Sequence, residues 1–70
     1  MTLGKKIRAL RLKKGLSQEQ LGKAVGVSEP MICMIERGTK NPSLQIGAEI
    51  AAVLGITIDE LLEDDNNPLF

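Results

Sequence analysis

Residues 18–35 constrain the fold of this chain more than any other segment, because two short helical patterns flank a glycine there. The first pattern places Leu21 and Val25 four residues apart, and the second places Ile32 and Ile35 three residues apart. Gly26 lies between them and can adopt the positive φ of a tight turn at low cost. The spacing therefore predicts two short helices held against each other across a turn, with the outer face of the second helix left exposed.

Composition favours an all-α fold. The chain has 70 residues, enough for one domain, and 43% of them are hydrophobic. Phe70 is the only aromatic residue, so the core must be aliphatic. A sheet would usually carry more aromatic residues and an alternating β-branched pattern. We therefore expect a compact all-α domain of five helices.

Cap residues divide the chain into these helices. Their expected ranges, caps included, are about 3–14, 17–25, 28–38, 43–54 and 57–63. Capping boxes are expected at Ser17 with Gln20 and at Thr57 with Glu60. Residues 1–63 would form the domain and residues 64–70 a tail. The buried positions expected in the last two helices are Leu44, Ile50, Ala51, Leu54 and either Leu61 or Leu62.

Charge is divided unevenly along the chain. Residues 1–40 hold all nine Lys and Arg with three Glu, a net charge of +6, whereas residues 41–70 hold six acids and no base, a net charge of −6. Such an asymmetry indicates an anionic partner for the basic half, although the net charge of the whole chain is zero. The alternative is a helical protein whose charges are merely solvated.

Residue types that support catalysis or metal binding are scarce. His is absent and Cys33 is the single cysteine, which excludes a disulfide framework within the chain, a Ser–His or Cys–His pair and an intramolecular zinc site. No glycine-rich phosphate loop appears. We therefore expect no enzyme, no cofactor and no small-molecule substrate. Because no long apolar run and no apolar leader stretch is present, we also expect a cytoplasmic protein without a membrane helix.

The second helix of the pair is the candidate DNA-recognition helix, here called the reading head. With Ile32 and Ile35 buried, the opposite arc holds Pro30, Cys33, Met34 and Arg37, with Glu29 and Met31 at its margins. Arg37 can pair with phosphate or guanine, and Glu29 can accept from cytosine N4. Pro30, Met31 and Met34 can touch only thymine methyl groups or sugars. The alternative is that this Met-Cys-Met cluster meets another protein, because Met is common on adaptable binding surfaces.

Several residues spread along the chain point to a family. They are Arg11, the LSQEQLG segment, Ile32, the ERG of Glu36 to Gly38, Pro42, and the closing VLG and ELL elements. With these residues, about four-fifths of the chain, from Ile7 to Leu62, resembles the phage repressor and Cro family (XRE-like) of helix-turn-helix regulators. The resemblance implies an ion pair between Arg11 and Glu36 that ties the first helix to the end of the third. Two independent surface charges are the alternative.

The resemblance also implies a set of DNA contacts. Gln18 would approach the DNA backbone and the reading head, while Ser17, Lys40 and Asn41 match positions that contact phosphate. Positions matching Glu29, Pro30 and Met34 often read bases through Gln, Arg, Ser or Thr, and those residue types are missing here. The full set of expected contacts is Ser17, Gln18, Ser28, Glu29, Pro30, Met31, Cys33, Met34, Arg37, Lys40 and Asn41.

These observations predict a sequence-specific DNA-binding transcriptional regulator, the repressor of a prophage or mobile element, that places its third helix in the major groove as a homodimer on double-stranded DNA. A protein-interaction module or an antitoxin with the same fold is the alternative. The expected dimer contact involves Ile46, Ile58, Leu62, Leu69 and Phe70, with Glu63, Asp64 and Asp65 at its rim.

Overall fold

The computed structural model describes residues 2–62 and contains five helices and no strand within that range. The helices are α1 (Leu3–Lys13), α2 (Gln18–Val25), α3 (Glu29–Arg37), α4 (Leu44–Leu54) and α5 (Ile58–Leu62). The all-α prediction and its five helices are therefore confirmed. The expected tail at 64–70, the end of the last helix at Glu63, and the dimer residues Leu69 and Phe70 lie outside the described residues.

Helix starts follow the predicted caps. The Gln20 N–H donates to Ser17 Oγ at 3.0 Å and the Ser17 N–H donates to Gln20 Oε1 at 2.8 Å, which completes the first capping box. The Ser28 and Ser43 hydroxyls accept from the N–H groups three residues ahead of them. These bonds satisfy donors that a helix N-terminus leaves without a partner, so the sequence fixes where these helices begin.

The second capping box lies at the start of α5. The Thr57 N–H donates to Glu60 Oε1 and the Glu60 N–H donates to Thr57 Oγ1, both at 3.0 Å. The Thr57 N–H, as a donor to the carboxylate, holds the pKa of Glu60 below its ordinary value. The backbone carbonyl of Glu60 accepts a hydrogen bond from Lys6 Nζ, and this bond connects α5 to α1.

The turn between α2 and α3 brings their backbones into close contact. Gly26 has a φ of 79°, and the Val27 N–H donates to the Gly22 carbonyl at 2.9 Å, a Schellman-type helix end. A Cβ atom at Gly22 would lie 2.7 Å from the Val27 carbonyl oxygen. The helix-turn-helix therefore needs one glycine for its turn and another for its packing distance.

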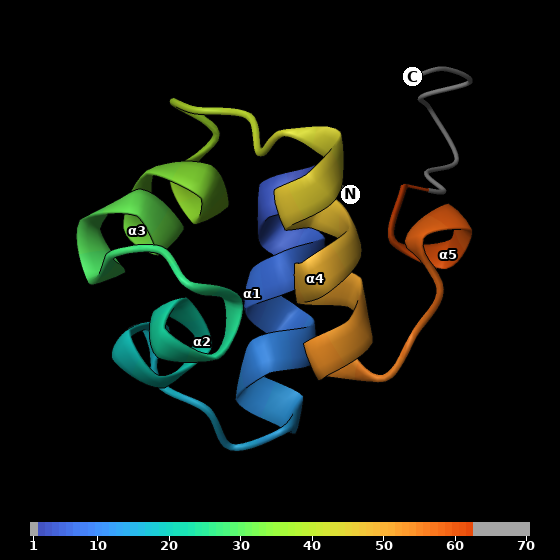
Figure 1. Cartoon of the computed structure of the whole chain (residues 1–70), viewed down its shortest axis with the longest axis horizontal. Coiled ribbons are helices and arrows are strands. Elements are labelled where there is room, and N and C mark those ends of the chain that lie inside the picture. The colour runs from blue at the N-terminus through green and yellow to red at the C-terminus, as the bar shows by residue number, and fades with distance from the viewer. Residues whose placement is uncertain (1, 63–70) are drawn as a thin grey trace.

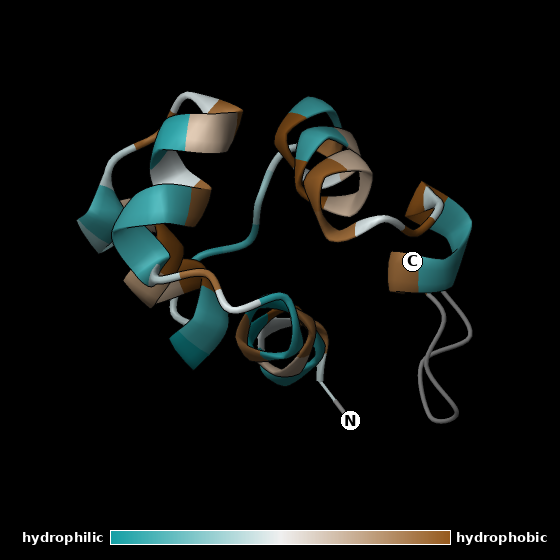
Figure 2. Cartoon of the chain, turned by 90° about the horizontal axis from the view of Figure 1, so that it is seen from below, coloured by the Kyte–Doolittle hydropathy of each residue, from teal (hydrophilic) through white to brown (hydrophobic). Residues whose placement is uncertain are grey.

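The core is aliphatic and is shared by all five helices. Its fully buried residues are Ile7, Leu21, Val25, Ile32, Ile35, Ile50, Ala51, Leu54 and Leu61. In Figure 1, α2 and α3 lie on one side of α1 and α4, and α5 lies on the other. Figure 2 shows that the outward turns at these two edges are largely hydrophilic. Of the two leucines considered for α5, Leu61 is the buried one, while Leu62 is only partly covered.

The expectation that Leu44 points into the core is wrong, because this side chain is 75% exposed. The buried stripe of α4 is formed by Gly47, Ile50, Ala51 and Leu54. At about 100° per residue, Leu44 lies roughly 70° from the centre of that stripe. It is also the first residue of the helix, and in Figure 1 the first turn of α4 extends beyond the ends of the neighbouring helices.

A buried ion pair joins α1 to α3, as the family resemblance implied. Arg11 Nε donates to Glu36 Oε2 at 2.7 Å and Arg11 Nη2 donates to Glu36 Oε1 at 3.1 Å. Arg11 Nη1 donates to the Leu16 carbonyl, and Gln18 Nε2 donates to Glu36 Oε1. Arg11 is 6% exposed and Glu36 is 8% exposed. The pair thus holds three helices and the α1–α2 loop together in one hydrogen-bonded cluster.

Removing one partner of this pair should cost far more than removing a surface pair. We expect Glu36→Ala to lower the free energy of unfolding by about 3–5 kcal/mol, because Arg11 is left buried without its carboxylate. The double variant with Arg11→Ala should lose clearly less than the two single losses combined. Urea unfolding of the three variants measures this coupling, and additive losses would contradict it. Glu19→Ala is the control: it breaks an exposed pair with Lys23 at 4.0 Å and should cost at most about 0.5 kcal/mol.

Substituting alanine for two helical glycines should change the stability of the domain in opposite directions. Gly22→Ala should destabilise the domain by about 1–3 kcal/mol, because the new Cβ forces α2 away from the backbone of the turn. Gly47→Ala should stabilise it by up to about 1 kcal/mol, since a Cβ there would lie 3.5 Å from Ile58 Cδ1, an ordinary contact. Thermal unfolding measures both variants, and a Gly22→Ala protein as stable as the parent would show that the backbones can separate without cost.

Candidate nucleic-acid interface

Helix α3 presents one uncovered stripe. Pro30, Met34 and Arg37 are exposed and Cys33 is partly exposed, at a spacing that places all four on one side of the helix. Ile32 and Ile35 on the opposite side are buried in the core. The predicted division of α3 into a buried side and an exposed side is therefore confirmed. Because the buried side packs in the core, α3 cannot shift without disturbing that core.

The N-terminal turn of α3 has few donors left for a ligand. The Ser28 hydroxyl accepts from the Met31 N–H at 3.3 Å, and Pro30 has no N–H. Glu29, the first residue of the helix, is exposed and adds a negative charge. This end of α3 therefore offers a carboxylate, the Ser28 hydroxyl and an apolar ring rather than a nest of amide groups.

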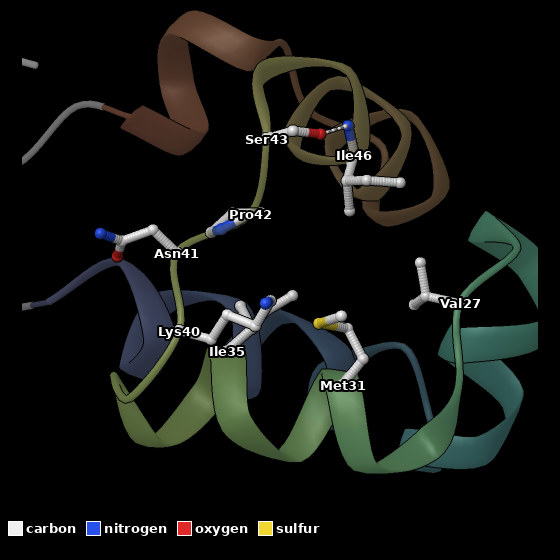
Figure 3. Close-up of a pocket in the computed structure, with 8 residues that line it drawn as sticks. All are labelled: Val27, Met31, Ile35, Lys40, Asn41, Pro42, Ser43 and Ile46. Carbon is white, nitrogen blue, oxygen red and sulfur yellow. Dashed lines mark hydrogen bonds between the residues drawn. The ribbon is translucent and has the colours of Figure 1, made fainter.

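Met31, expected at the margin of the exposed arc, is partly buried. It packs against the hydrophobic core and lines a cavity of about 300 Å³ between α3 and α4. Figure 3 shows Met31 and Ile35 on α3 facing this cavity, with Val27 and Ile46 across it. Met31 is thus partly covered, as expected for a position at the boundary between the buried and the exposed side of α3.

The loop after α3 is bonded to the end of that helix. The Thr39 N–H, the Thr39 hydroxyl and the Lys40 N–H all donate to the Met34 carbonyl, at 3.0, 3.2 and 3.3 Å. Lys40 and Asn41 are exposed directly beside these bonds. This role of Thr39 had no clear sequence signal, because its hydroxyl acts only through the fold of the loop.

Gln18 brings the start of α2 to the same end of α3. Its amide donates to Glu36 at 3.1 Å, so Gln18 and the neighbouring Ser17 lie close to the last turn of α3. Arg37 is in that last turn, and Lys40 and Asn41 follow it in the loop to α4. These five residues were expected to contact phosphate or to approach the DNA backbone, and sequence spacing alone did not show the bond between Gln18 and Glu36.

Charge at this end is positive. Arg11 neutralises Glu36, whereas Arg37 and Lys40 form no ion pair within residues 2–62. Arg37 and Lys40 are therefore exposed cations that could attract an anion. In the same range of residues, no group of three or more His, Cys, Asp or Glu side chains could hold a metal ion. No helix among these residues is long and apolar enough to cross a membrane.

Comparisons with known proteins agree with this geometry. A helix-turn-helix family model matches residues 7–61. An uncharacterized HTH-type transcriptional regulator of Archaeoglobus fulgidus is 40% identical over 65 residues, which cover 93% of each chain. The uncharacterized HTH-type regulator YazB of Bacillus subtilis is 47% identical over 58 residues, 83% of this chain and 84% of the relative.

A solved structure extends the likeness to the fold. The P22 c2 repressor, crystallised with a synthetic operator, superimposes with a TM-score of 0.87 at 35% identity and covers 93% of this chain and 98% of its own. The family match includes the whole of α2 and α3, and so the exposed stripe. The chain therefore belongs to the helix-turn-helix family of DNA-binding transcriptional regulators, in its phage repressor and Cro-type branch.

Proposed function

We propose that this protein represses transcription from the operator of a prophage or mobile element by inserting α3 into the major groove. The observation that carries the proposal is the exposed stripe of α3, which stands on a packed aliphatic core and ends beside two uncompensated cations. An α-helix presented in this way fits the width of the major groove of B-DNA.

The proposed contacts divide into two groups. Arg37 and Lys40 would bind phosphates through their charge, and the other backbone-positioning contacts would come from Ser17, Gln18 and Asn41. The groove-facing group would be Ser28, Glu29, Pro30, Cys33 and Met34. Because half to two-thirds of protein–DNA hydrogen bonds go to phosphate and sugar, an apolar groove-facing group is compatible with tight binding.

DNA binding should weaken steeply as salt rises. We expect the logarithm of the association constant to fall with log salt by about 0.9 per phosphate neutralised, and Arg37→Ala and Lys40→Ala each to reduce that slope by about one. Asp59→Asn is the control, because it also changes one charge but lies on α5, at the opposite edge of the domain (Figure 1). Fluorescence anisotropy with a labelled duplex measures the slopes. A response to salt that is flat for the parent protein would remove the DNA proposal.

We further propose that the protein acts as a two-fold dimer, so that two copies of α3 enter successive major grooves about 34 Å apart. Ile46, Ile58 and Leu62 are partly buried and remain the described candidates for the contact between copies. All three carry some exposed apolar surface in the C-terminal half. Ile58 and Leu62 lie on α5, at the opposite edge of the domain from α3 (Figure 1), whereas Ile46 lines the same cavity as Lys40.

A palindromic duplex with two half-sites should bind at least tenfold more tightly than a duplex with one, because the second copy binds at a raised effective concentration. Sedimentation at tens of micromolar should show the free protein in equilibrium with a dimer. Ile58→Asp should lower the affinity for the palindrome to that for the half-site while leaving half-site binding unchanged. Equal affinity of the parent protein for both duplexes would contradict the dimer.

A protein-interaction module or antitoxin is the second candidate, and the apolar character of Pro30, Cys33 and Met34 favours it. Exposed apolar surface on an otherwise polar protein often marks a protein contact. Among residues 2–62, the other large exposed hydrophobic residues, Leu12 and Leu44, lie on α1 and α4 rather than on this stripe. The salt titration separates the two candidates, because an apolar protein contact would show little dependence on salt.

A further inference from the structure

We propose that Pro30 and Met34 read thymine in the operator half-site through its 5-methyl group, and that the protein therefore recognises methyl groups in the major groove rather than hydrogen-bonding edges. This inference rests on the proposed insertion of α3 into the major groove. It assigns a role in base recognition to two residues of the exposed stripe that are not proposed to contact phosphate.

The stripe lacks the groups that read bases by hydrogen bonding. Between Glu29 at its start and Arg37 at its end, the exposed positions are Pro30 and Met34, and the partly exposed ones are Met31 and Cys33. The proline has no N–H, and the Ser28 hydroxyl, which accepts the N–H of Met31 at 3.3 Å, lies before this stretch. A base edge that faced Pro30 or Met34 would lose its hydration without gaining a hydrogen bond, and that loss costs free energy.

Thymine is the base that best fits such a surface. Its C5-methyl group is the one apolar feature among the major-groove edges of the four bases. Met34 is 38% exposed, so its side chain has surface available to cover a methyl group. The flexible thioether of methionine can adapt to the position of that group. Glu29 adds selection against guanine, whose groove edge presents only acceptors.

The spacing of the two side chains fits neighbouring base pairs. Pro30 and Met34 are one helical turn apart on the same side of α3, about 6 Å along its axis. Base pairs rise by about 3.4 Å, so two methyl groups within about two steps of each other can be touched at once.

The backbone that carries Met34 is held in place from both sides. Its carbonyl accepts the N–H groups of Thr39 and Lys40 and the Thr39 hydroxyl, and Ile35 beside it is buried in the core. The loop that carries the proposed phosphate contact Lys40 is thus bonded to the residue that would touch the base. Phosphate binding by Lys40 would therefore fix how deeply the Met34 side chain reaches into the groove.

The test begins with selection of duplexes from a randomised library of 30 base pairs, in low salt and with the full chain. Each thymine of a selected duplex is then replaced singly by deoxyuridine, which removes the methyl group and keeps the base pairing. We expect one or two thymines in each half-site at which the replacement weakens binding by about fourfold, since burial of one methyl-sized group contributes about 0.8 kcal/mol. Deoxyuridine outside the half-sites is the internal control and should change binding by less than about 1.5-fold.

A protein variant tests the same contact from the other side. Met34→Gln supplies the side chain that pairs with adenine, so it should lose the sensitivity to deoxyuridine at one position and prefer adenine there. Ala52→Gln places the same side chain on an exposed position of α4 and should leave both properties unchanged. Circular dichroism confirms that each variant is folded before binding is compared.

The outcomes separate this inference from the proposed function. Binding to selected duplexes that is insensitive to deoxyuridine at every thymine overturns the methyl reading and leaves DNA binding intact. Failure to enrich any duplex overturns both. Thymine-dependent binding that disappears with deoxyuridine and changes with Met34→Gln supports the methyl reading.

Discussion

The Arg11–Glu36 pair is the interaction on which the exposed stripe depends. Glu36 is the next-to-last residue of α3, so any movement of that helix relative to α1 would separate the two charges. Desolvating both groups is costly, and the structure offsets that cost with two direct hydrogen bonds between them and further bonds to Leu16 and Gln18. Among the described residues, no buried side-chain polar atom is left without a partner. The orientation of α3 is therefore fixed by charge as well as by apolar packing.

Close backbone contacts act with this pair. A Cβ at Gly4 would lie 2.5 Å from the carbonyl oxygens of Ile35 and Glu36, so the start of α1 lies directly against the end of α3. Gly22 makes the equivalent approach between α2 and the turn. Two glycines and one ion pair thus position α3 from both neighbouring helices. A small aliphatic core alone would leave a helix of nine residues less precisely oriented.

Function follows from how different chemistries are distributed over this rigid helix. The exposed cations Arg37 and Lys40 lie at and just after its C-terminal end, where they would suit phosphates under the proposed function. The middle of the exposed stripe is apolar and suits a surface without hydrogen-bonding partners. The acidic character of residues 41–62 lies elsewhere along the chain, so repulsion by DNA would favour approach through α2 and α3. Net charge, which is zero, conceals this arrangement.

The sequence by itself determined the five helices, their caps at Ser17, Ser28, Ser43 and Thr57, and the family resemblance that implied the Arg11–Glu36 pair. These features depend on local hydrogen bonds, on periodicity and on a motif, all of which are written in neighbouring residues. Tertiary structure alone decided that Leu44 is exposed, that Met31 lines a cavity beside α4, and that Gln18 meets Glu36. Each of these features depends on how one helix is placed against another, and the periodicity of a single helix carries no information about that placement.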